Sequence, residues 1–112
     1  MTSEPALINE ILLAASRIPG VRLWRQNSGL FLTPNGRAVR AGIPGCADIS
    51  GIVQCERGCG HRLEIECKTG RLKQSEQQLH FAAMVTRHGG VYILARTVDD
   101  AVTGIEQAQQ HA

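Results

Sequence analysis

The sequence predicts an α/β domain in which one mixed central β-sheet is flanked by helices. Three observations carry this prediction. Apolar residues near the start of the chain and after residue 75 recur with helical spacing, short apolar segments between them read as strands, and glycine- or proline-rich turns separate the two kinds. At 112 residues the chain has the length of one domain, so we expect residues 1–112 to share a single core.

The first third of the chain is expected to hold one helix and several short strands. Residues 3–18 carry one apolar stripe, with Ser3 suited to the N-cap and Pro19 just beyond the end. A tight turn is expected at residues 34–36, where proline, asparagine and glycine follow one another. Extended segments are predicted at residues 21–26, 30–33 and 37–40.

The middle of the chain predicts a β-hairpin. Residues 49–55 and 62–68 are strand-like, and the glycine-rich residues 56–60 lie between them. Side chains alternate along a strand, so Leu63, Ile65 and Cys67 are expected to face a core, while the charged residues between them face a site.

The last third predicts a helix, a buried strand and a final helix. Ser75 and Gln78 fit a capping box, which places a helix start at Ser75, and glycines 89 and 90 end that helix. Residues 91–95 read as a strand, and Thr97 with Asp100 caps a helix that is expected to fray from residue 107. The packed side of the middle helix is predicted to hold Leu79, Ala82, Ala83 and Val85 or Thr86.

Three charged residues of the hairpin form a candidate metal centre. With the hairpin loop centred near residue 57 or 58, Asp48 lies opposite Glu66 or Lys68, and directly opposed residues point to the same side of a sheet. Carboxylate oxygens are the ligands that Mg²⁺ prefers, so Asp48 and Glu66 are the expected metal ligands, with the Cys67 backbone carbonyl as a further oxygen. Lys68 would orient or deprotonate a water, or neutralise charge on a phosphate. The alternative is an exposed strand face whose charges are only solvated.

Four cysteines leave several interpretations open. Cys55, Cys59 and His61 stand close together at the hairpin tip, which suits zinc ligation, although a fourth ligand is not evident. A Cys55–Cys59 disulfide or free thiols are the alternatives, and Cys46 is expected to be structural.

Composition limits the classes of partner. The formal charge is +2, from 12 basic and 10 acidic residues, so the positions of the charges matter more than their total. No apolar run is long enough to span a membrane, and the N-terminus lacks the pattern of a signal peptide. We therefore expect an intracellular, cytoplasmic protein that does not enter a membrane.

Several segments together resemble the VRR-NUC domain of the PD-(D/E)xK nuclease superfamily, which has the restriction-endonuclease-like fold. The resemblance covers nearly the whole chain. It is carried by Glu4, by the Trp-Arg-x-Asn-x-Gly run in residues 23–29, by the glycine-rich run in residues 42–48, by Ile-Glu-Cys-Lys-Thr at residues 65–69 and by residues 74–77. Ala47 replaces the proline that often precedes the aspartate, while the carboxylate itself is retained.

The resemblance implies a Mg²⁺- or Mn²⁺-dependent deoxyribonuclease. It assigns catalysis to Asp48, Glu66 and Lys68, places Gln77 near the site, and adds Glu4 as a metal ligand, directly or through water. A chain without a further domain is similar to the homodimeric members that cut branched DNA such as four-way junctions. Side chains flanking the site are then expected to contact DNA, or else to be solvated surface groups: Arg25, Asn27, Arg37, Arg40, Arg71 and Lys73.

Two other classes of function remain as alternatives. One is a non-catalytic module that binds DNA or protein on the same fold. The other is a zinc-stabilised interaction protein that uses Cys55, Cys59 and His61. Trp24 is expected to belong to the core rather than to form a platform on which bases stack.

Overall fold

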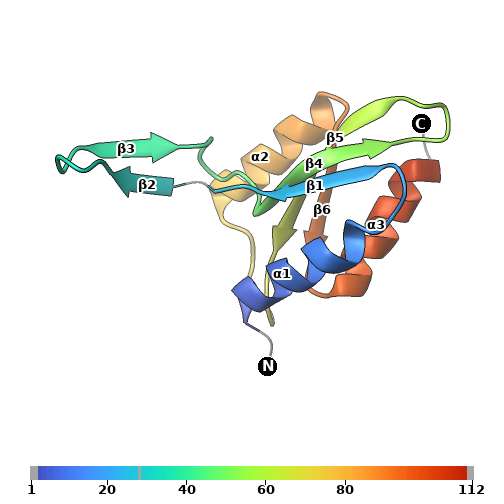
Figure 1. Ribbon diagram of the computed structural model, residues 1–112, viewed down its shortest axis with the longest axis horizontal. Helices are drawn as coiled ribbons and strands as arrows, with labels where there is room; N and C mark the ends of the chain where they lie inside the picture. The colour runs from blue at the N-terminus through green and yellow to red at the C-terminus, as the bar shows by residue number, and fades with distance from the viewer. Residues whose placement is uncertain (1–2, 28, 111–112) are drawn as a thin grey trace.

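The computed structural model describes residues 3–27 and 29–110, which fold as an α/β domain around a mixed four-stranded sheet (Figure 1). The strand order in this sheet is β1-β4-β5-β6; the first three strands run antiparallel, and β6 is parallel to β5. The strands of the sheet are β1 (Val21–Arg25), β4 (Ile49–Gln54), β5 (Gly60–Cys67) and β6 (Val91–Ala95). The helices are α1 (Glu4–Ala15), α2 (Glu76–Arg87) and α3 (Val98–Gln110).

One face of the sheet carries the main core. Helices α1 and α3 lie against each other and cover this face, where the alternate residues of β4 and β5 are apolar (Figure 1). Burying each large aliphatic side chain contributes about 1.5–3 kcal/mol. The predicted inward set of β5 is confirmed, because Leu63, Ile65 and Cys67 have no exposed surface.

The opposite face is covered only in part, by the single helix α2. Phe81 of this helix packs against Tyr92 of β6 with their rings edge to face at 6.4 Å, and Val85 is buried beside them. The predicted packed side of α2 was wrong at Leu79, which is 52% exposed, and at Ala83. The stripe that faces the sheet contains residues 78, 81 and 85, because the large Phe81 ring sets the rotation of the helix.

Because α2 covers only part of this sheet face, Trp24 is not buried in the core as expected. This side chain lies on the α2 face of β1, beyond the strands that α2 covers, and 39% of it is exposed. The prediction that Trp24 belongs to the core was therefore wrong.

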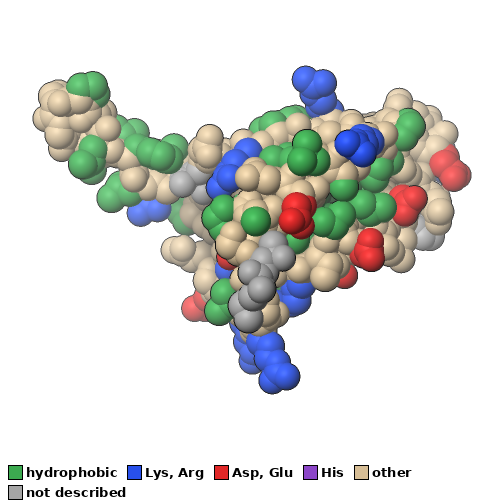
Figure 2. All heavy atoms as spheres, turned by 60° about the horizontal axis from the view of Figure 1, so that its bottom comes forward, with side chains coloured by type: hydrophobic (Ala, Val, Ile, Leu, Met, Phe, Trp, Pro, Cys, Tyr) green, Lys and Arg blue, Asp and Glu red, His purple; other side chains and the backbone are tan. Residues whose placement is uncertain are grey.

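A second correction concerns the number of sheets. Strands β2 (Gly29–Leu32) and β3 (Ala38–Ala41) pair only with each other, in a two-stranded hairpin that projects from the domain (Figure 1). A single sheet had been expected. β1 occupies the edge of β4, and neither β2 nor β3 pairs with the outer edge of β1. Its surface carries several hydrophobic side chains, visible at the left of Figure 2.

The helix ends follow the predicted capping chemistry. Ser3 caps α1, and Ser75 with Gln78 forms a capping box at α2. Thr97 and Asp100 exchange hydrogen bonds at the start of α3. Helix α3 continues to Gln110 without the predicted fraying, because Gln109 donates a side-chain hydrogen bond to the Pro19 carbonyl at 2.6 Å.

Across residues 3–27 and 29–110, no helix combines the length and the apolar character that crossing a membrane requires.

Candidate metal centre

The register of the β4–β5 hairpin brings two predicted acids together. Ile49 pairs with Ile65, so the next step along the ladder places Asp48 opposite Glu66. Opposed side chains project to the same side of a sheet, with Cβ atoms about 4.5–5.5 Å apart. The sequence predicted Asp48 opposite either Glu66 or Lys68, and the structure has it opposite Glu66.

A third carboxylate joins them from the first helix. Glu4 is the first residue of α1, and oxygens of Glu4, Asp48 and Glu66 all lie within 4.8 Å of one another. The helix N-terminus favours a negative charge at Glu4, which offsets part of the repulsion among the three carboxylates. Among the described residues this acidic trio is the single set of three or more ligating side chains that converge.

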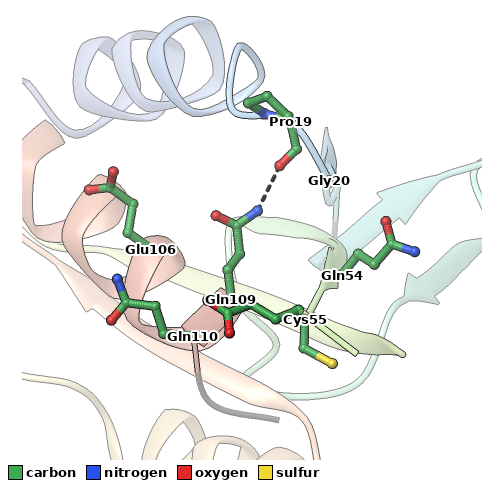
Figure 3. Close-up of a pocket in the computed structure, with 8 residues that line it drawn as sticks. Pro19, Gly20, Gln54, Cys55, Glu106, Gln109 and Gln110 are labelled. Carbon is green, nitrogen blue, oxygen red and sulfur yellow. Dashed lines mark hydrogen bonds between the residues drawn. The ribbon is translucent and has the colours of Figure 1, made fainter. Parts of the chain in front are cut away.

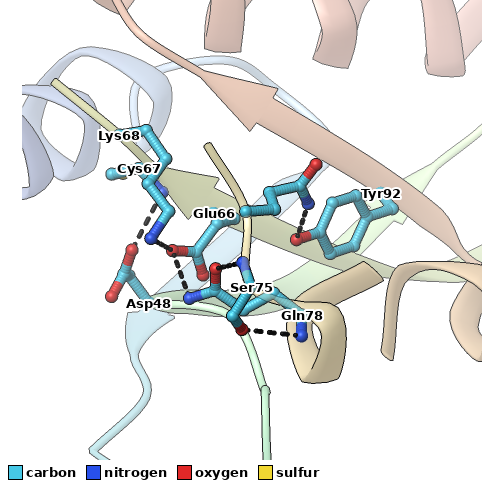
Figure 4. Close-up of polar contacts among 8 residues, drawn as sticks. Asp48, Glu66, Cys67, Lys68, Ser75, Gln78 and Tyr92 are labelled. Carbon is cyan, nitrogen blue, oxygen red and sulfur yellow. Dashed lines mark hydrogen bonds and ion pairs between the residues drawn. The ribbon is translucent and has the colours of Figure 1, made fainter. Parts of the chain in front are cut away.

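Polar contacts fix the two strand carboxylates (Figure 4). The backbone N–H of Cys67 donates to Asp48 Oδ2 at 2.8 Å. The Lys68 Nζ lies 3.6 Å from Glu66 Oε2, and the Gln78 side-chain amide donates to the same oxygen at 3.1 Å. Asp48 and Glu66 are therefore held in place before any ligand arrives.

Glu66 is a buried acid with one unsatisfied oxygen. Its exposed fraction is 1%, and Oε1 has no hydrogen-bond partner among the described residues. Burial, together with the charge of Asp48, raises the pKa of Glu66 to about 8, although Lys68 acts in the opposite direction. A buried carboxyl oxygen without a partner costs about 1–3 kcal/mol or more, and a cation bound there would remove this cost.

The donor set suits a hard divalent cation. Three carboxylates supply only oxygen ligands, which Mg²⁺ and Mn²⁺ accept, whereas a structural zinc site favours sulfur and nitrogen. The burial of Glu64 and Glu66, at 2% and 1% exposure, also shows that the alternative of an exposed, solvated strand face was wrong for these acids.

Cys67 takes part through its main chain. Its side chain faces the core with no exposed surface, and burial followed by the charge of Asp48 raises the pKa of the thiol to about 12. A thiol with that pKa stays protonated and is a poor metal ligand. The backbone carbonyl of Cys67 as a ligand stays a prediction, while its N–H contact to Asp48 is observed.

The glutamine that reaches the site is Gln78 rather than Gln77. Gln77 is exposed and lines a surface pocket beside Pro44 and His80. Gln78 uses its carbonyl oxygen in the capping box and its amide nitrogen on Glu66. The capping-box pattern could have revealed this, because it already turns Gln78 back toward the start of α2 and the end of β5.

The loop before Asp48 is tied to the same helix. Gly45 has φ +79°, and a Cβ at this position would lie 2.3 Å from the backbone oxygen of Gln77. Only glycine permits both the conformation and this close approach. This contact packs the loop that precedes β4 against the first turn of α2, and so helps to position Asp48 relative to Gln78.

The six side chains predicted to contact DNA are all exposed, but they lie in different places. Arg25 ends β1, and its charge partly offsets the rise in the pKa of Cys67, the residue next to Glu66. Arg71 and Lys73 lie in the loop that follows Lys68. Arg40 is in β3 and Arg37 directly precedes it, so the projecting hairpin carries both. Asn27 lies between β1 and β2.

The cysteines do not form a second centre. All four are free thiols, and Cys55, Cys59 and His61 are not among the convergent ligating sets of the described chain. Figure 3 shows the pocket beside Cys55, lined also by Pro19, Glu106 and Gln109. Cys55 follows the end of β4, whereas Asp48 precedes its start. Glu56 and Glu106 also line this pocket, but they and Cys55 are not among the convergent ligating sets of the described residues.

Comparison of the chain with models of protein families, with curated proteins and with solved structures gave no match.

Proposed function

We propose that this protein is a Mg²⁺- or Mn²⁺-dependent deoxyribonuclease that hydrolyses phosphodiester bonds, built on a restriction-endonuclease-like core. The observation that carries the proposal is the unsatisfied, buried oxygen of Glu66 beside Asp48 and Glu4, with the Lys68 amine 3.6 Å from the same carboxylate. Carboxylates that could hold a metal ion, with a lysine beside them, suit metal-assisted hydrolysis of phosphate esters.

Asp48 and Glu66 would hold the metal ion, with Glu4 as a further ligand either directly or through water. When bound, the ion supplies a water of lowered pKa and stabilises negative charge on the phosphate. The carboxylates are oriented in advance by the Cys67 N–H and the Gln78 amide, which reduces the cost of assembling the site.

Lys68 is the residue proposed to act on the reacting groups. Its side chain is only 14% exposed, and its ammonium group stands beside the acidic trio. From there it would orient the attacking water or neutralise the charge that develops on the phosphate. Gln77 is exposed on the first turn of α2, and Gln78 rather than Gln77 donates a hydrogen bond to Glu66, so no catalytic role is proposed for Gln77.

The proposed substrate is DNA, in particular branched DNA such as a four-way junction, cut by a homodimer. Exposed basic residues that precede and follow the trio residues Asp48 and Glu66 along the chain suit phosphate contacts, which would make binding weaker as salt rises. Two-fold symmetry would provide two centres for two strands. A strictly monomeric mass in solution would contradict junction cutting by a dimer but not nuclease activity.

The test is cleavage of labelled duplex, single-stranded, flap and four-way-junction DNA with Mg²⁺ or Mn²⁺. The wild type is compared with Lys68→Ala and Glu66→Gln, and Glu106→Gln serves as the matched control because Glu106 is exposed beside the remote pocket. We expect cleavage to be lost in the first two variants and kept in the third.

A non-catalytic DNA-binding or protein-interaction module on the same fold is the alternative, and calcium separates it from an enzyme. Ca²⁺ accepts the same oxygen ligands as Mg²⁺ but prefers different geometry. DNA binding with Ca²⁺ together with cleavage in Mg²⁺ supports the enzyme. DNA binding with both ions and no cleavage of any substrate would overturn the nuclease proposal in favour of the module.

A further inference from the structure

Trp24 shares a sheet face with the acidic trio. The ladder places it opposite Ser50, which in turn lies opposite Glu64. Asp48 and Glu66 form the next row on the same face, because same-face residues along a strand are two positions apart. Consecutive rows are about 7 Å apart along the strands. The Trp24 ring therefore lies one row from the candidate metal centre.

The ring is accessible because of where it lies in the sheet. β1 is an edge strand, so no further strand of the sheet lies beyond it, and α2 packs on the β6 side of the same face. The result is a large aromatic side chain, 39% exposed, on the face that holds the site. It is also the only tryptophan in the chain.

A guanidinium group is held over this ring. The Arg62 Cζ lies 5.6 Å from the Trp24 ring centroid, within the range of a cation–π interaction. The Arg62 Nε donates to Glu64 Oε1 at 2.7 Å, and Ser50 Oγ donates to Glu64 Oε2 at 2.7 Å. The Glu64 side chain is 3% exposed, so a buried, fully bonded carboxylate fixes an arginine that is itself 53% exposed.

The Glu64 carboxylate fixes the position of an exposed arginine beside an exposed ring. A buried carboxylate must be paired, whereas an exposed Arg–Trp contact on a sheet edge adds little stability by itself. Planar aromatic and guanidinium groups stack on the π-face of any nucleobase, and they lose little entropy when their positions are already fixed. Exposed Arg22, two residues from Trp24 on the same strand face, adds positive charge for a phosphate backbone.

We infer that Trp24 and Arg62 form a stacking site for the base of an unpaired nucleotide, while the adjoining phosphodiester lies at the acidic trio. The inference rests on the proposed function and narrows its substrate. A paired base inside a duplex offers no free ring face, so a side chain can stack only on a base that has left the duplex. The site therefore selects DNA with unpaired nucleotides, such as those at a branch point or a flap, over continuous duplex.

The intrinsic fluorescence of the single tryptophan tests this directly. Wild-type protein is titrated in Ca²⁺ with a short oligothymidine and, separately, with a blunt duplex, while binding is followed in parallel by the anisotropy of the labelled DNA. We expect the oligothymidine to quench Trp24 with the same midpoint as the anisotropy change. The duplex should leave the fluorescence nearly unchanged.

Variants of Trp24 test whether the contact reported by its fluorescence contributes to the affinity for oligothymidine. Trp24→Ala should weaken oligothymidine binding about 5- to 150-fold, the range for loss of one stacked base, while Trp24→Phe should recover much of it. Ile52→Ala is the matched control, because Ile52 is an exposed apolar residue of the same sheet face. Circular dichroism of each variant confirms that the fold is retained.

The outcomes separate the two proposals. Three results would overturn the stacking site. They are oligothymidine binding without quenching of Trp24 fluorescence, an equal loss of affinity in Trp24→Ala and Ile52→Ala, and no binding of any DNA. Quenching without cleavage in Mg²⁺ or Mn²⁺ would support the stacking site and overturn the nuclease. Cleavage that is unaffected by Trp24→Ala on every substrate would leave the nuclease standing and overturn the stacking site.

Discussion

Two glutamates on one face of β5 are buried to the same degree, but their surroundings differ. Glu64 is bonded at both oxygens, by Ser50 and by Arg62. Glu66, two residues on, has one oxygen held by Gln78 and Lys68 and another with no partner in the described structure. The hydrogen bonds of the first carboxylate are all made within the protein, whereas one oxygen of the second has no partner among the described residues. The two acids are equally buried, so it is the unpaired oxygen of Glu66, beside Asp48 and Glu4, that singles it out as the proposed metal ligand.

The largest expected difference between the two glutamates is in catalysis. Glu66→Gln should lower the rate of DNA cleavage by at least about 10²-fold, because a neutral amide is a poor ligand for a hard cation and the charge balance with Lys68 is lost. Glu64→Gln should keep a much larger share of the activity than Glu66→Gln on the same four-way junction, because Glu64 is not one of the proposed metal ligands. Single-turnover cleavage rates measure this, and equal losses in the two variants would remove the distinction.

The second difference is in stability. Ser50→Ala removes the donor to Glu64 Oε2 and leaves a buried oxygen without a partner, which should lower the free energy of unfolding by about 1–3 kcal/mol. Urea denaturation measures the change, with Ser16→Ala at the end of α1 as an exposed serine for comparison. An unchanged urea midpoint would show that the hydrogen bond from Ser50 to Glu64 does not contribute to the stability of the protein.

A third, smaller effect is the pH dependence of the metal-free protein. The pKa of Glu66 rises on folding from its ordinary 4.5 to about 8, chiefly through burial and then through the charge of Asp48. The folded state therefore binds a proton more tightly than the unfolded state. The stability due to this carboxyl is fully present below pH 4.5 and is lost as the pH rises through about 8.

The measurement is thermal unfolding of the wild type and Glu66→Gln across that pH window, both in chelator. The variant should gain stability relative to the wild type as the pH rises from 4.5 to about 8, and added Mn²⁺ should reverse the trend in the wild type alone. Parallel pH profiles for the two proteins in chelator would show that Glu66 does not titrate in this window.

The sequence was sufficient for features that depend on neighbours along the chain. Alternation within β5 separated the core residues from the acids, and the short hairpin loop placed Asp48 opposite Glu66 without knowledge of the rest of the fold. The capping residues Ser3, Ser75 and Asp100 were likewise predicted, because a cap bonds within a few residues of itself.

Features that depend on packing between residues far apart in the sequence were not predicted. The rotation of α2, which brings Gln78 and not Gln77 to Glu66, is set by Phe81 against Tyr92. The exposure of Trp24 follows from its place on an edge strand that α2 does not cover, and β2 and β3 pair with each other rather than with the sheet. The capping box gave a local signal for Gln78, whereas the exposure of Trp24 and the pairing of β2 with β3 depend on residues far apart in the sequence.

Calorimetric titration with Mn²⁺ determines whether the acidic trio of Glu4, Asp48 and Glu66 binds a divalent cation. Wild-type protein, Glu66→Gln and Glu64→Gln are titrated at the same pH and ionic strength. We expect a Mn²⁺-binding site at the acidic trio in the wild type that is retained in Glu64→Gln and lost in Glu66→Gln. Absence of binding to the wild type, or binding that survives Glu66→Gln unchanged, would contradict this expectation.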